Sequence, residues 1–256
     1  MNSSTRIVIL CGLLFVTLTG LIGFNLYQYG YAKKDVEFGS QVRNYLLENP
    51  KVIREVIQRL QVQEAREEAE EKSKNLAAYM GELENDGYSY VAGNPNGDVT
   101  IVEFFDYRCG YCKRAYGDLI KTVEEDGNIR LVLKEFPILG EDSVLATRAA
   151  IAAEKQNKYM EFHDNLMKVR GGLSKGRIMQ IAADSGLNTD QLLKDIDDEE
   201  ISVKIQKTYQ LANSLNITGT PAFVIGGELA AGAIPASTMK EMVAAARAKK
   251  ASAVTN

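Results

Sequence analysis

The sequence is poor in the residue types from which several common kinds of site are built. It has no tryptophan and a single histidine, His163, so a zinc site with two histidine ligands or a histidine-rich metal site cannot be built. Three cysteines in 256 residues are too few for a scaffold stapled by disulfides. The net charge of −4, with no basic stretch interleaved with aromatic residues, argues against nucleic-acid binding.

The remaining composition is that of a globular protein. Hydrophobic residues make up 45% of the chain and charged residues 25%. A length of 256 residues allows one large domain, or a smaller domain with appendages.

Residues 1–32 are predicted to be a signal peptide or a membrane anchor. The stretch 7–26 contains no charged residue, and about 20 apolar residues are enough to span a bilayer. Gly30-Tyr31-Ala32 fits a signal-peptidase site only loosely, so an uncleaved inner-membrane anchor is slightly favoured over a cleaved signal. Cys11 lies inside the apolar run and is given no role. Either alternative exports the body of the protein to a compartment where disulfides persist.

Residues 33–85 are predicted to form a helical stalk outside the compact core. Asn49 followed by Pro50 is a typical helix start, and residues 64–74 are almost wholly polar. A solvated spacer is one interpretation. Self-association is favoured, because a helix whose apolar face has no core of its own usually finds a partner helix. The apolar stripe consists of Val42, Tyr45, Leu46, Val52, Ile53, Val56, Ile57 and Leu60.

Residues 86–256 are predicted to be one α/β body with a helical insertion at about 141–213. Strands are expected at 88–91, 99–105, 129–135 and 222–225, with Gly226-Gly227 as a hairpin turn before a further short strand. A C-terminal helix is expected at 236–249. Within the insertion, helices are expected at 146–155, 158–169 and 175–185, from about 189, and from 197.

The pair Cys109 and Cys112 is the strongest candidate for chemistry. The spacing Cys-x-x-Cys falls where the apolar strand 99–105 gives way to a predicted helix. Two such sulfurs can close a disulfide or stand as two thiols, and the helix dipole stabilises a thiolate on the first. The alternative is half of a zinc site, for which Cys11 and His163 are poorly placed as further ligands. A redox-active Cys109–Cys112 disulfide, with no metal and no other cofactor, is therefore favoured.

The order of elements resembles the thioredoxin fold, and the helical insertion narrows the resemblance to DsbA-like thiol–disulfide oxidoreductases. It covers roughly residues 88–249 and is carried by Glu103-Phe104-Phe105, Cys109-Gly110-Tyr111-Cys112 and Thr220-Pro221-Ala222-Phe223. The segment 45–50, Tyr-Leu-Leu-Glu-Asn-Pro, looks like the N-terminal region of ScsC-type proteins. These are DsbA-like periplasmic proteins that trimerise through this region and can act as disulfide isomerases.

The resemblance implies a role for each cysteine and for the loop opposite them. Cys109 would be the nucleophile at the helix N-terminus with its sulfur exposed, and Cys112 the deeper resolving thiol. Pro221 would be a cis-proline facing the dithiol, and Thr220 would offer backbone hydrogen bonds to an extended substrate peptide. The alternative for Pro221 is an ordinary trans turn proline.

Glu103, Gly110 and Tyr111 would tune the site. A buried acid such as Glu103 can ferry protons during exchange, whereas the alternative is a strand residue facing solvent. Gly110 and Tyr111 stand where DsbA carries Pro-His, so we expect a smaller lowering of the Cys109 pKa and a weaker oxidant. His163 lies among core residues at helical spacing and is expected to be structural.

The sequence thus predicts an exported thiol–disulfide oxidoreductase that forms or rearranges disulfides in periplasmic proteins. Self-association favours an isomerase, because an oligomer presents several dithiols around one cavity. One alternative is a monomeric DsbA-like oxidase, and another is a copper-tolerance protein whose dithiol binds Cu(I). Expected partners are cysteine-containing exported proteins, a membrane redox partner and further copies of the chain, for which the resemblance to ScsC-type proteins implies a trimer, but no nucleic acid.

Overall fold

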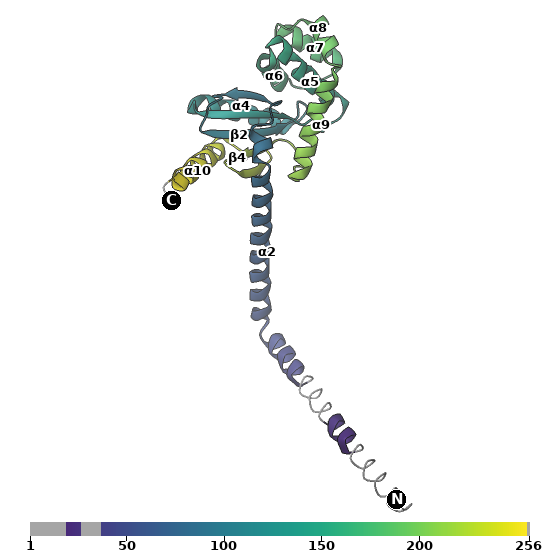
Figure 1. Ribbon diagram of the computed structural model, residues 1–256, viewed down its shortest axis with the longest axis vertical. Helices are drawn as coiled ribbons and strands as arrows, with labels where there is room; N and C mark the ends of the chain where they lie inside the picture. The colour runs from purple at the N-terminus through teal and green to yellow at the C-terminus, as the bar shows by residue number, and fades with distance from the viewer. Residues whose placement is uncertain (1–18, 27–36, 255–256) are drawn as a thin grey trace, which may run out of the picture. The chain divides into compact units, whose positions relative to one another are not determined.

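The computed structural model describes residues 19–26 and 37–254 (Figure 1). Cys11 and most of the predicted signal or anchor segment 1–32 lie outside these residues. Among the residues described, no helix is both long and apolar enough to cross a bilayer. Contacts divide the chain into two units, Met1–Glu68 and Ala69–Asn256, and each is described by itself.

The described part of the first unit is helical. Residues 37–48 form a helix, Asn49 interrupts it, and α2 (Pro50–Ala78) begins at the proline. The Asn49 side chain donates a hydrogen bond to the Tyr45 carbonyl oxygen at 2.9 Å, which satisfies an acceptor at the end of the first helix. Proline is favoured at a first helical position because the missing N–H has no intrahelical partner there. The predicted restart at Asn49-Pro50 is confirmed.

Large apolar side chains of this unit are exposed to solvent. Ile53, Val56, Ile57 and Leu60 of α2 are spaced by three or four residues along the helix and keep between 42% and 57% of their surface exposed. Such a stripe is typical of a helix that buries its apolar face against another chain.

The second unit is built on a five-stranded mixed sheet in the order β1-β3-β2-β4-β5. Strands β2 and β3 are parallel, because a helix connects them, and the other pairs are antiparallel. The first strand begins two residues later than predicted, because the amides of Tyr88 and Ser89 donate to the Asp86 side chain rather than to the sheet. The strands are β1 (Tyr90–Gly93), β2 (Val99–Phe105), β3 (Ile129–Glu135), β4 (Ala222–Ile225) and β5 (Glu228–Ala231).

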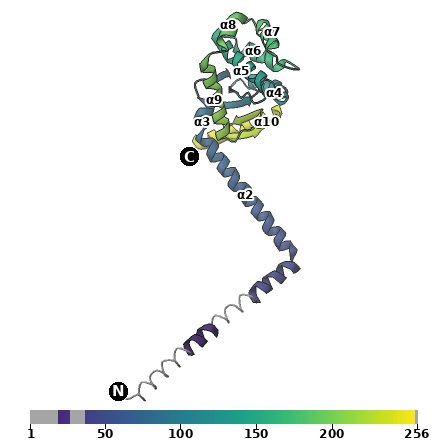
Figure 2. The ribbon, with the colours of Figure 1, turned by 90° about the vertical axis from the view of Figure 1, so that its right-hand side faces the viewer.

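Helices cover both faces of the sheet. Helices α4 (Gly110–Asp126) and α10 (Ala236–Val254) pack on one face, and α3 (Met80–Glu84) and the end of α9 (Glu199–Ser214) pack on the other (Figure 2). Leu76 and Leu83 are buried in the hydrophobic core on the face of the sheet that α3 and α9 cover, against strand residues. For this reason the compact unit begins near residue 69, whereas the sequence placed the whole of 33–85 outside the core.

The predicted helical insertion is present between β3 and β4, and Figure 2 shows α5–α8 gathered together beyond the sheet. The helix expected at 146–155 begins earlier, at residue 141. Side-chain acceptors fix three of the helix starts: Ser174 caps α7, Asn188 caps α8 and Asp198 caps α9. Besides α9, the insertion contains α5 (Glu141–Ala153), the 3₁₀ helix η1 (Glu154–Gln156), α6 (Tyr159–Lys168), α7 (Lys175–Asp184) and α8 (Thr189–Asp195).

The predicted Gly226-Gly227 hairpin turn joins β4 to β5. Both glycines have positive φ angles, 59° and 82°, which suits the turn that matches the twist of two antiparallel strands. A Cβ atom on Gly226 would lie 2.3 Å from the Cβ of Ala246 in α10, so close packing also requires glycine there.

Candidate active site

The turn between β2 and α4 positions the first cysteine. Asp106 is buried, and its side chain accepts hydrogen bonds from the Arg108 amide at 2.7 Å and the Ser143 hydroxyl at 2.8 Å. Its carbonyl accepts from the Cys109 amide at 3.0 Å. Cys109 is the N-cap of α4, and its sulfur accepts from the Cys112 amide at 3.5 Å. The junction therefore places the Cys109 sulfur at the positive end of a helix, as predicted.

The two cysteines are free thiols at different depths. Cys112 is fully buried, and Cys109 keeps 6% of its surface. The expected exposure of the Cys109 sulfur is therefore met only in small part. The loop before β4 lies against it, and the Cys109 sulfur is 3.1 Å from the Thr220 carbonyl oxygen, to which it donates when it is protonated. Gly110 and Tyr111 are exposed, so the accessible edge of the site is formed by the residues between the cysteines.

The Thr220–Pro221 peptide bond is cis, so the alternative of an ordinary trans turn proline is wrong. The Pro221 carbonyl accepts from the Gly232 amide at 2.8 Å, which ties the loop to the end of β5. The structure thus brings Thr220 and Pro221 to the cysteines, more than one hundred residues away along the chain.

The surroundings of the two sulfurs drive their pKa values apart. Hydrogen bonding by the Cys112 side chain, and further hydrogen bonds from Thr220 and from backbone amides, outweigh desolvation and lower the pKa of Cys109 to about 5. Burial, together with the hydrogen bond to Cys109 and the charge of Glu103, raises the pKa of Cys112 far above its usual range. At neutral pH, Cys109 is therefore a thiolate and Cys112 a thiol.

Glu103 lies in β2 with none of its surface exposed, so the alternative of a solvent-facing strand residue is wrong. Neither carboxyl oxygen has a hydrogen-bond partner among the described residues. Burial raises the pKa of Glu103 to about 8, and the charges of Cys109 and Glu135 add to the effect. A buried acid that titrates near neutral pH beside a dithiol is suited to taking up and releasing protons.

A second buried acid, Glu135, was not singled out by the sequence analysis. It ends β3, and its carboxylate accepts hydrogen bonds from the hydroxyls of Tyr107, Tyr159 and Thr147. The only indication in the sequence was a glutamate at the end of a strand of apolar residues. Its hydrogen-bond partners could not be predicted, because they come from three other segments of the chain. His163 joins the same network through Tyr107 and is fully buried among aromatic rings, in line with its predicted structural role.

Cationic side chains flank the dithiol. The guanidinium of Arg114 lies 4.2 Å from the centre of the Tyr111 ring, and the Lys113 ammonium donates to the Val169 carbonyl oxygen at 2.7 Å. The second contact links the start of α4 to the end of α6. No group of three or more histidine, cysteine, aspartate or glutamate residues in the described part of the chain is arranged to hold a metal ion.

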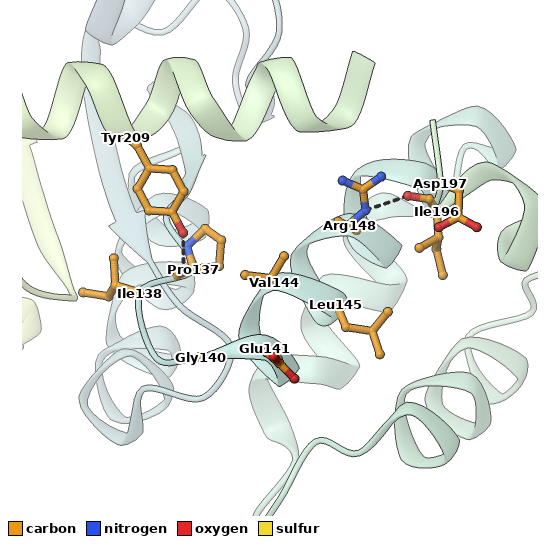
Figure 3. Close-up of a pocket in the computed structure, with 10 residues that line it drawn as sticks. All are labelled: Pro137, Ile138, Gly140, Glu141, Val144, Leu145, Arg148, Ile196, Asp197 and Tyr209. Carbon is orange, nitrogen blue, oxygen red and sulfur yellow. Dashed lines mark hydrogen bonds between the residues drawn. The ribbon is translucent and has the colours of Figure 1, made fainter. Parts of the chain in front are cut away.

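A surface pocket of about 750 Å³ lies beside the insertion and contains neither cysteine (Figure 3). Its wall includes Pro137, Ile138 and Gly140, which belong to a loop that Asp106 and Arg108 hold through Leu139. Arg148 in this pocket is engaged within the insertion, because it donates to Ile196, Ser202 and Asp198. The chemically equipped site is therefore the dithiol and not this pocket.

Comparison with protein families gives two matches. The DSBA-like thioredoxin domain matches residues 100–244, and the copper resistance protein ScsC N-terminal domain matches residues 36–67. The first match contains both cysteines, Glu103, Glu135 and Pro221, and the second contains the apolar stripe of α2.

Solved structures agree with these matches. A thioredoxin-like oxidoreductase from Silicibacter pomeroyi DSS-3 is 43% identical, with a TM-score of 0.64 over 66% of this chain and 97% of that chain. A linker-deletion mutant of Proteus mirabilis ScsC is 27% identical, with a TM-score of 0.65 over 84% of this chain and 95% of that chain.

Curated proteins match over the thioredoxin-like part. A probable disulfide bond formation protein D from Bacillus cereus is 26% identical over 54% of this chain and 70% of its own length. Na(+)/H(+) antiporters from Salinispora arenicola, Herminiimonas arsenicoxydans and Salinispora tropica also match, but the chain spans only 22–28% of their lengths. The chain belongs to the DSBA-like thioredoxin domain family of thiol–disulfide oxidoreductases and carries an ScsC N-terminal domain ahead of that domain.

Proposed function

We propose that this protein catalyses thiol–disulfide exchange in exported proteins, with Cys109 as the attacking group, and that it acts mainly as an isomerase. The observation that carries the proposal is the pairing of a stabilised Cys109 thiolate with a buried Cys112 thiol, opposite the Thr220–Pro221 loop. A low thiol pKa in the first cysteine and a high one in the second suit a nucleophile and a resolving group.

In the isomerase reaction, the Cys109 thiolate attacks one sulfur of an incorrect substrate disulfide. A Cys109–substrate disulfide forms, and the second substrate sulfur leaves as a thiolate. Another substrate thiolate then attacks the substrate sulfur of this mixed disulfide, so the substrate regains a disulfide and Cys109 leaves as a thiolate. No net electrons are transferred.

Cys112 and Glu103 resolve a mixed disulfide that does not rearrange. Cys112 gives its proton to the Glu103 carboxylate and attacks the Cys109 sulfur, which closes the Cys109–Cys112 disulfide and releases a reduced substrate. The reverse sequence oxidises a substrate dithiol. Glu103 lies buried beside the dithiol and titrates near neutral pH, which supports this role.

The substrate would lie along the exposed edge of the site. We assign the backbone of Thr220, beside Pro221, to hydrogen bonding with an extended peptide, and the exposed Gly110 and Tyr111 to the surface that the peptide crosses. Tyr111 is 60% exposed and has a cation at its face, so it offers a planar apolar contact.

Self-association is the reason for preferring the isomerase direction. The exposed side chains of Ile53, Val56, Ile57 and Leu60, and the match of residues 36–67 to the ScsC N-terminal domain, support an oligomer, which we propose to be a trimer. Several dithiols held around one cavity can act on one misfolded chain, and a bulky oligomer would escape a membrane oxidase.

Export to the periplasm is part of the proposal. Another solved relative, from Salmonella enterica serovar Typhimurium, is described as a periplasmic thioredoxin-like protein. The apolar sequence 7–26 supports export through a signal peptide or an inner-membrane tether. The partners would be cysteine-containing exported proteins and a membrane redox protein that resets the dithiol.

The refolding of scrambled ribonuclease tests this proposal. We expect the reduced full-length chain to restore ribonuclease activity and Cys109→Ser to abolish that effect. Ile57→Glu should break the oligomer, as measured by analytical ultracentrifugation, and lower isomerase activity, whereas Gln58→Glu on the same helix should do neither. An isomerase rate that is unchanged in a monomeric Ile57→Glu variant would show that isomerisation does not need the oligomer, whereas a wild-type chain that is itself monomeric would favour the oxidase alternative.

A copper-binding function is the second candidate, favoured by the description of the N-terminal match as a copper resistance protein domain. Two thiolates are soft ligands that suit Cu(I). We expect Cu(I) titration with a competing chelator to show tight binding that Cys109→Ser removes. Binding of this kind together with failure in both ribonuclease refolding and insulin reduction would identify a carrier and not an enzyme.

A further inference from the structure

The Glu135 carboxylate has no part in the exchange steps above, yet it lies at the centre of a buried hydrogen-bond network. One carboxylate oxygen accepts from the hydroxyls of Tyr107 at 2.9 Å and Tyr159 at 2.8 Å. The other accepts from the Thr147 hydroxyl at 2.7 Å. Three donors aimed at one buried carboxyl group favour its ionised form.

The network continues to His163 without adding a positive charge. Tyr107 has a single hydroxyl proton, which it donates to Glu135, so its oxygen accepts the hydrogen bond from Nδ1 of His163 at 2.9 Å. Burial lowers the pKa of His163 to about 3, so its ring is neutral. The imidazole therefore orders Tyr107 but does not neutralise Glu135.

Glu135 and Glu103 lie on the same face of the sheet. In the parallel pairing of β2 with β3, Phe105 is opposite Glu135 and Glu103 is opposite Leu133. Side chains two residues apart on a strand share a face, so the two acids are diagonal neighbours, with backbone positions about 8 Å apart. Glu135 has three donors and Glu103 has no partner. The pair is therefore unequal: burial raises the pKa of both acids, and as the pH rises Glu135, with its three donors, ionises before Glu103, whose pKa its charge then raises.

We propose that Glu135 is a positioning residue of the redox site, whose negative charge holds a proton on Glu103 and thereby sets the pH at which Glu103 accepts the proton of Cys112. The inference rests on the proposed function, because it concerns the step in which Cys112 resolves a mixed disulfide. It adds a group that never touches the sulfurs.

The other titratable groups near Glu103 and Glu135 do not remove the electrostatic interaction between the two acids. Glu103 faces Cys109, Cys112 and Tyr116 of α4. Burial raises the pKa of Glu135 to about 8, its hydrogen bonds lower it, and the charge of Glu154 raises it. The Lys204 ammonium near Glu135 is bound to Glu154 at 3.2 Å. Besides Glu103, the titratable groups that bond to Glu135 or line the cavity beside it are Tyr88, Tyr90, Tyr107, Tyr159, Glu154 and Lys204, and His163 lies one hydrogen bond further, behind Tyr107.

Glu135 has its own access to solvent. A cavity of about 10 Å³, room for about one water molecule, is lined by Glu135, Tyr159, Glu154 and Lys204 among others. A larger pocket of about 340 Å³ shares the last three of these residues. Glu135 itself keeps 6% of its surface exposed, so a proton can reach it without passing Cys109.

Oxidation of the reduced chain by glutathione disulfide isolates the relevant step. The Cys109 thiolate attacks one sulfur of glutathione disulfide, and the first glutathione leaves as a thiolate. Cys112 then gives its proton to Glu103 and attacks the Cys109 sulfur, and the second glutathione leaves. At saturating glutathione disulfide, acid quenching and mass spectrometry follow the decay of the Cys109–glutathione adduct between pH 5 and pH 9.

Glu135→Gln removes the charge with little change of shape. The glutamine oxygen can accept from both tyrosines, and the Thr147 hydroxyl can turn to accept from the amide. We expect the midpoint of the pH–rate profile to fall by about one unit, as two carboxylates at this separation imply. In a Glu103→Gln background the same change should produce no shift, because the charge acts through Glu103.

Glu154→Gln should move the midpoint in the opposite direction. Loss of the Glu154 charge lets Glu135 ionise more readily, and Lys204 loses its partner, so Glu103 should hold its proton to a higher pH. This second variant keeps the proposal testable if Glu135→Gln fails to fold. A merely structural role of the network predicts changes in stability but no pair of opposite shifts.

The outcomes distinguish a failure of the role proposed for Glu135 from a failure of the proposed thiol–disulfide exchange. A lower midpoint in Glu135→Gln with a higher one in Glu154→Gln supports the proposal. An unmoved midpoint in a folded Glu135→Gln protein, or an equal shift in the Glu103→Gln background, overturns it. If the wild-type chain forms no Cys109–glutathione adduct at all, the proposed function itself fails.

Discussion

Replacing Glu103 by glutamine should flatten the dependence of stability on pH. In the reduced protein, burial and the charges of Cys109 and Glu135 raise the pKa of Glu103 from 4.5 to about 8. The native state therefore keeps a proton that the unfolded chain releases above pH 4.5. Stability from this group is fully present below pH 4.5 and is lost as the pH rises towards 8. Since one pKa unit corresponds to about 1.4 kcal/mol, the loss has a ceiling of about 5 kcal/mol, and we expect at least about 1 kcal/mol.

Urea unfolding of the reduced full-length chain measures this effect. The chain has no tryptophan, so circular dichroism is the appropriate signal. We expect the free energy of unfolding of the wild-type protein to fall between pH 5 and pH 8, and Glu103→Gln to show a much smaller slope. Glu124→Gln, an exposed site on α4, is the matched control and should keep the wild-type slope. Equal slopes for the wild type and Glu103→Gln would refute the reasoning.

Three further changes give separate expected outcomes. Cys112→Ser should trap a Cys109–substrate disulfide, visible by mass spectrometry, because the resolving thiol is gone; rapid decay of the adduct would contradict this. Arg247→Ala breaks a bridge to two carboxylates at the protein surface, and should lower stability by about 1 kcal/mol without changing exchange rates. Gly226→Ala should cost more than about 2 kcal/mol in a thermal or urea melt, because the new Cβ would meet Ala246 at 2.3 Å in a backbone with positive φ; a neutral result would rule out the close packing.

The local signals in the sequence predicted most of the elements that hold the site. An apolar β-branched run followed by Cys-x-x-Cys predicted the β2–α4 junction, and Gly226-Gly227 predicted the hairpin. These features depend on neighbours along the chain, which a sequence displays directly. The start of the first strand was predicted wrongly although its cause is also local. The amides of Tyr88 and Ser89 donate to the Asp86 side chain, and the alternation of residues does not reveal this contact.

Contacts between segments that are distant along the chain could not be predicted from the sequence. The network around Glu135 joins the end of β3 to the turn after β2, to α5 and to α6. Nothing in the local sequence distinguishes Tyr107 or Tyr159 from other aromatic core residues. The same holds for Leu76 and Leu83, which reach the sheet from a segment that appeared to be a stalk. A resemblance to a known family supplied the opposing Thr220–Pro221 loop, which spacing alone would not have placed at the cysteines.

The division of labour between the cysteines follows from their surroundings. Cys109 sits at a helix N-terminus with donors around its sulfur, whereas Cys112 is sealed behind it beside a buried acid. Gly110 and Tyr111 add no cation between them, which is consistent with a Cys109 pKa of about 5, above the value of about 3.5 typical of DsbA. A reduced form that is less stabilised makes a weaker oxidant.

The alkylation of the two cysteines by iodoacetamide, followed residue by residue with mass spectrometry across pH 3 to pH 9, tests the central claim most directly. The claim is that Cys109 alone is the activated nucleophile of the reduced protein. We predict that labelling of Cys109 rises with a midpoint near pH 5 and that Cys112 stays unlabelled up to pH 9. Labelling of Cys112 before Cys109, or a Cys109 midpoint at the ordinary thiol value of about 8.5, would contradict the account.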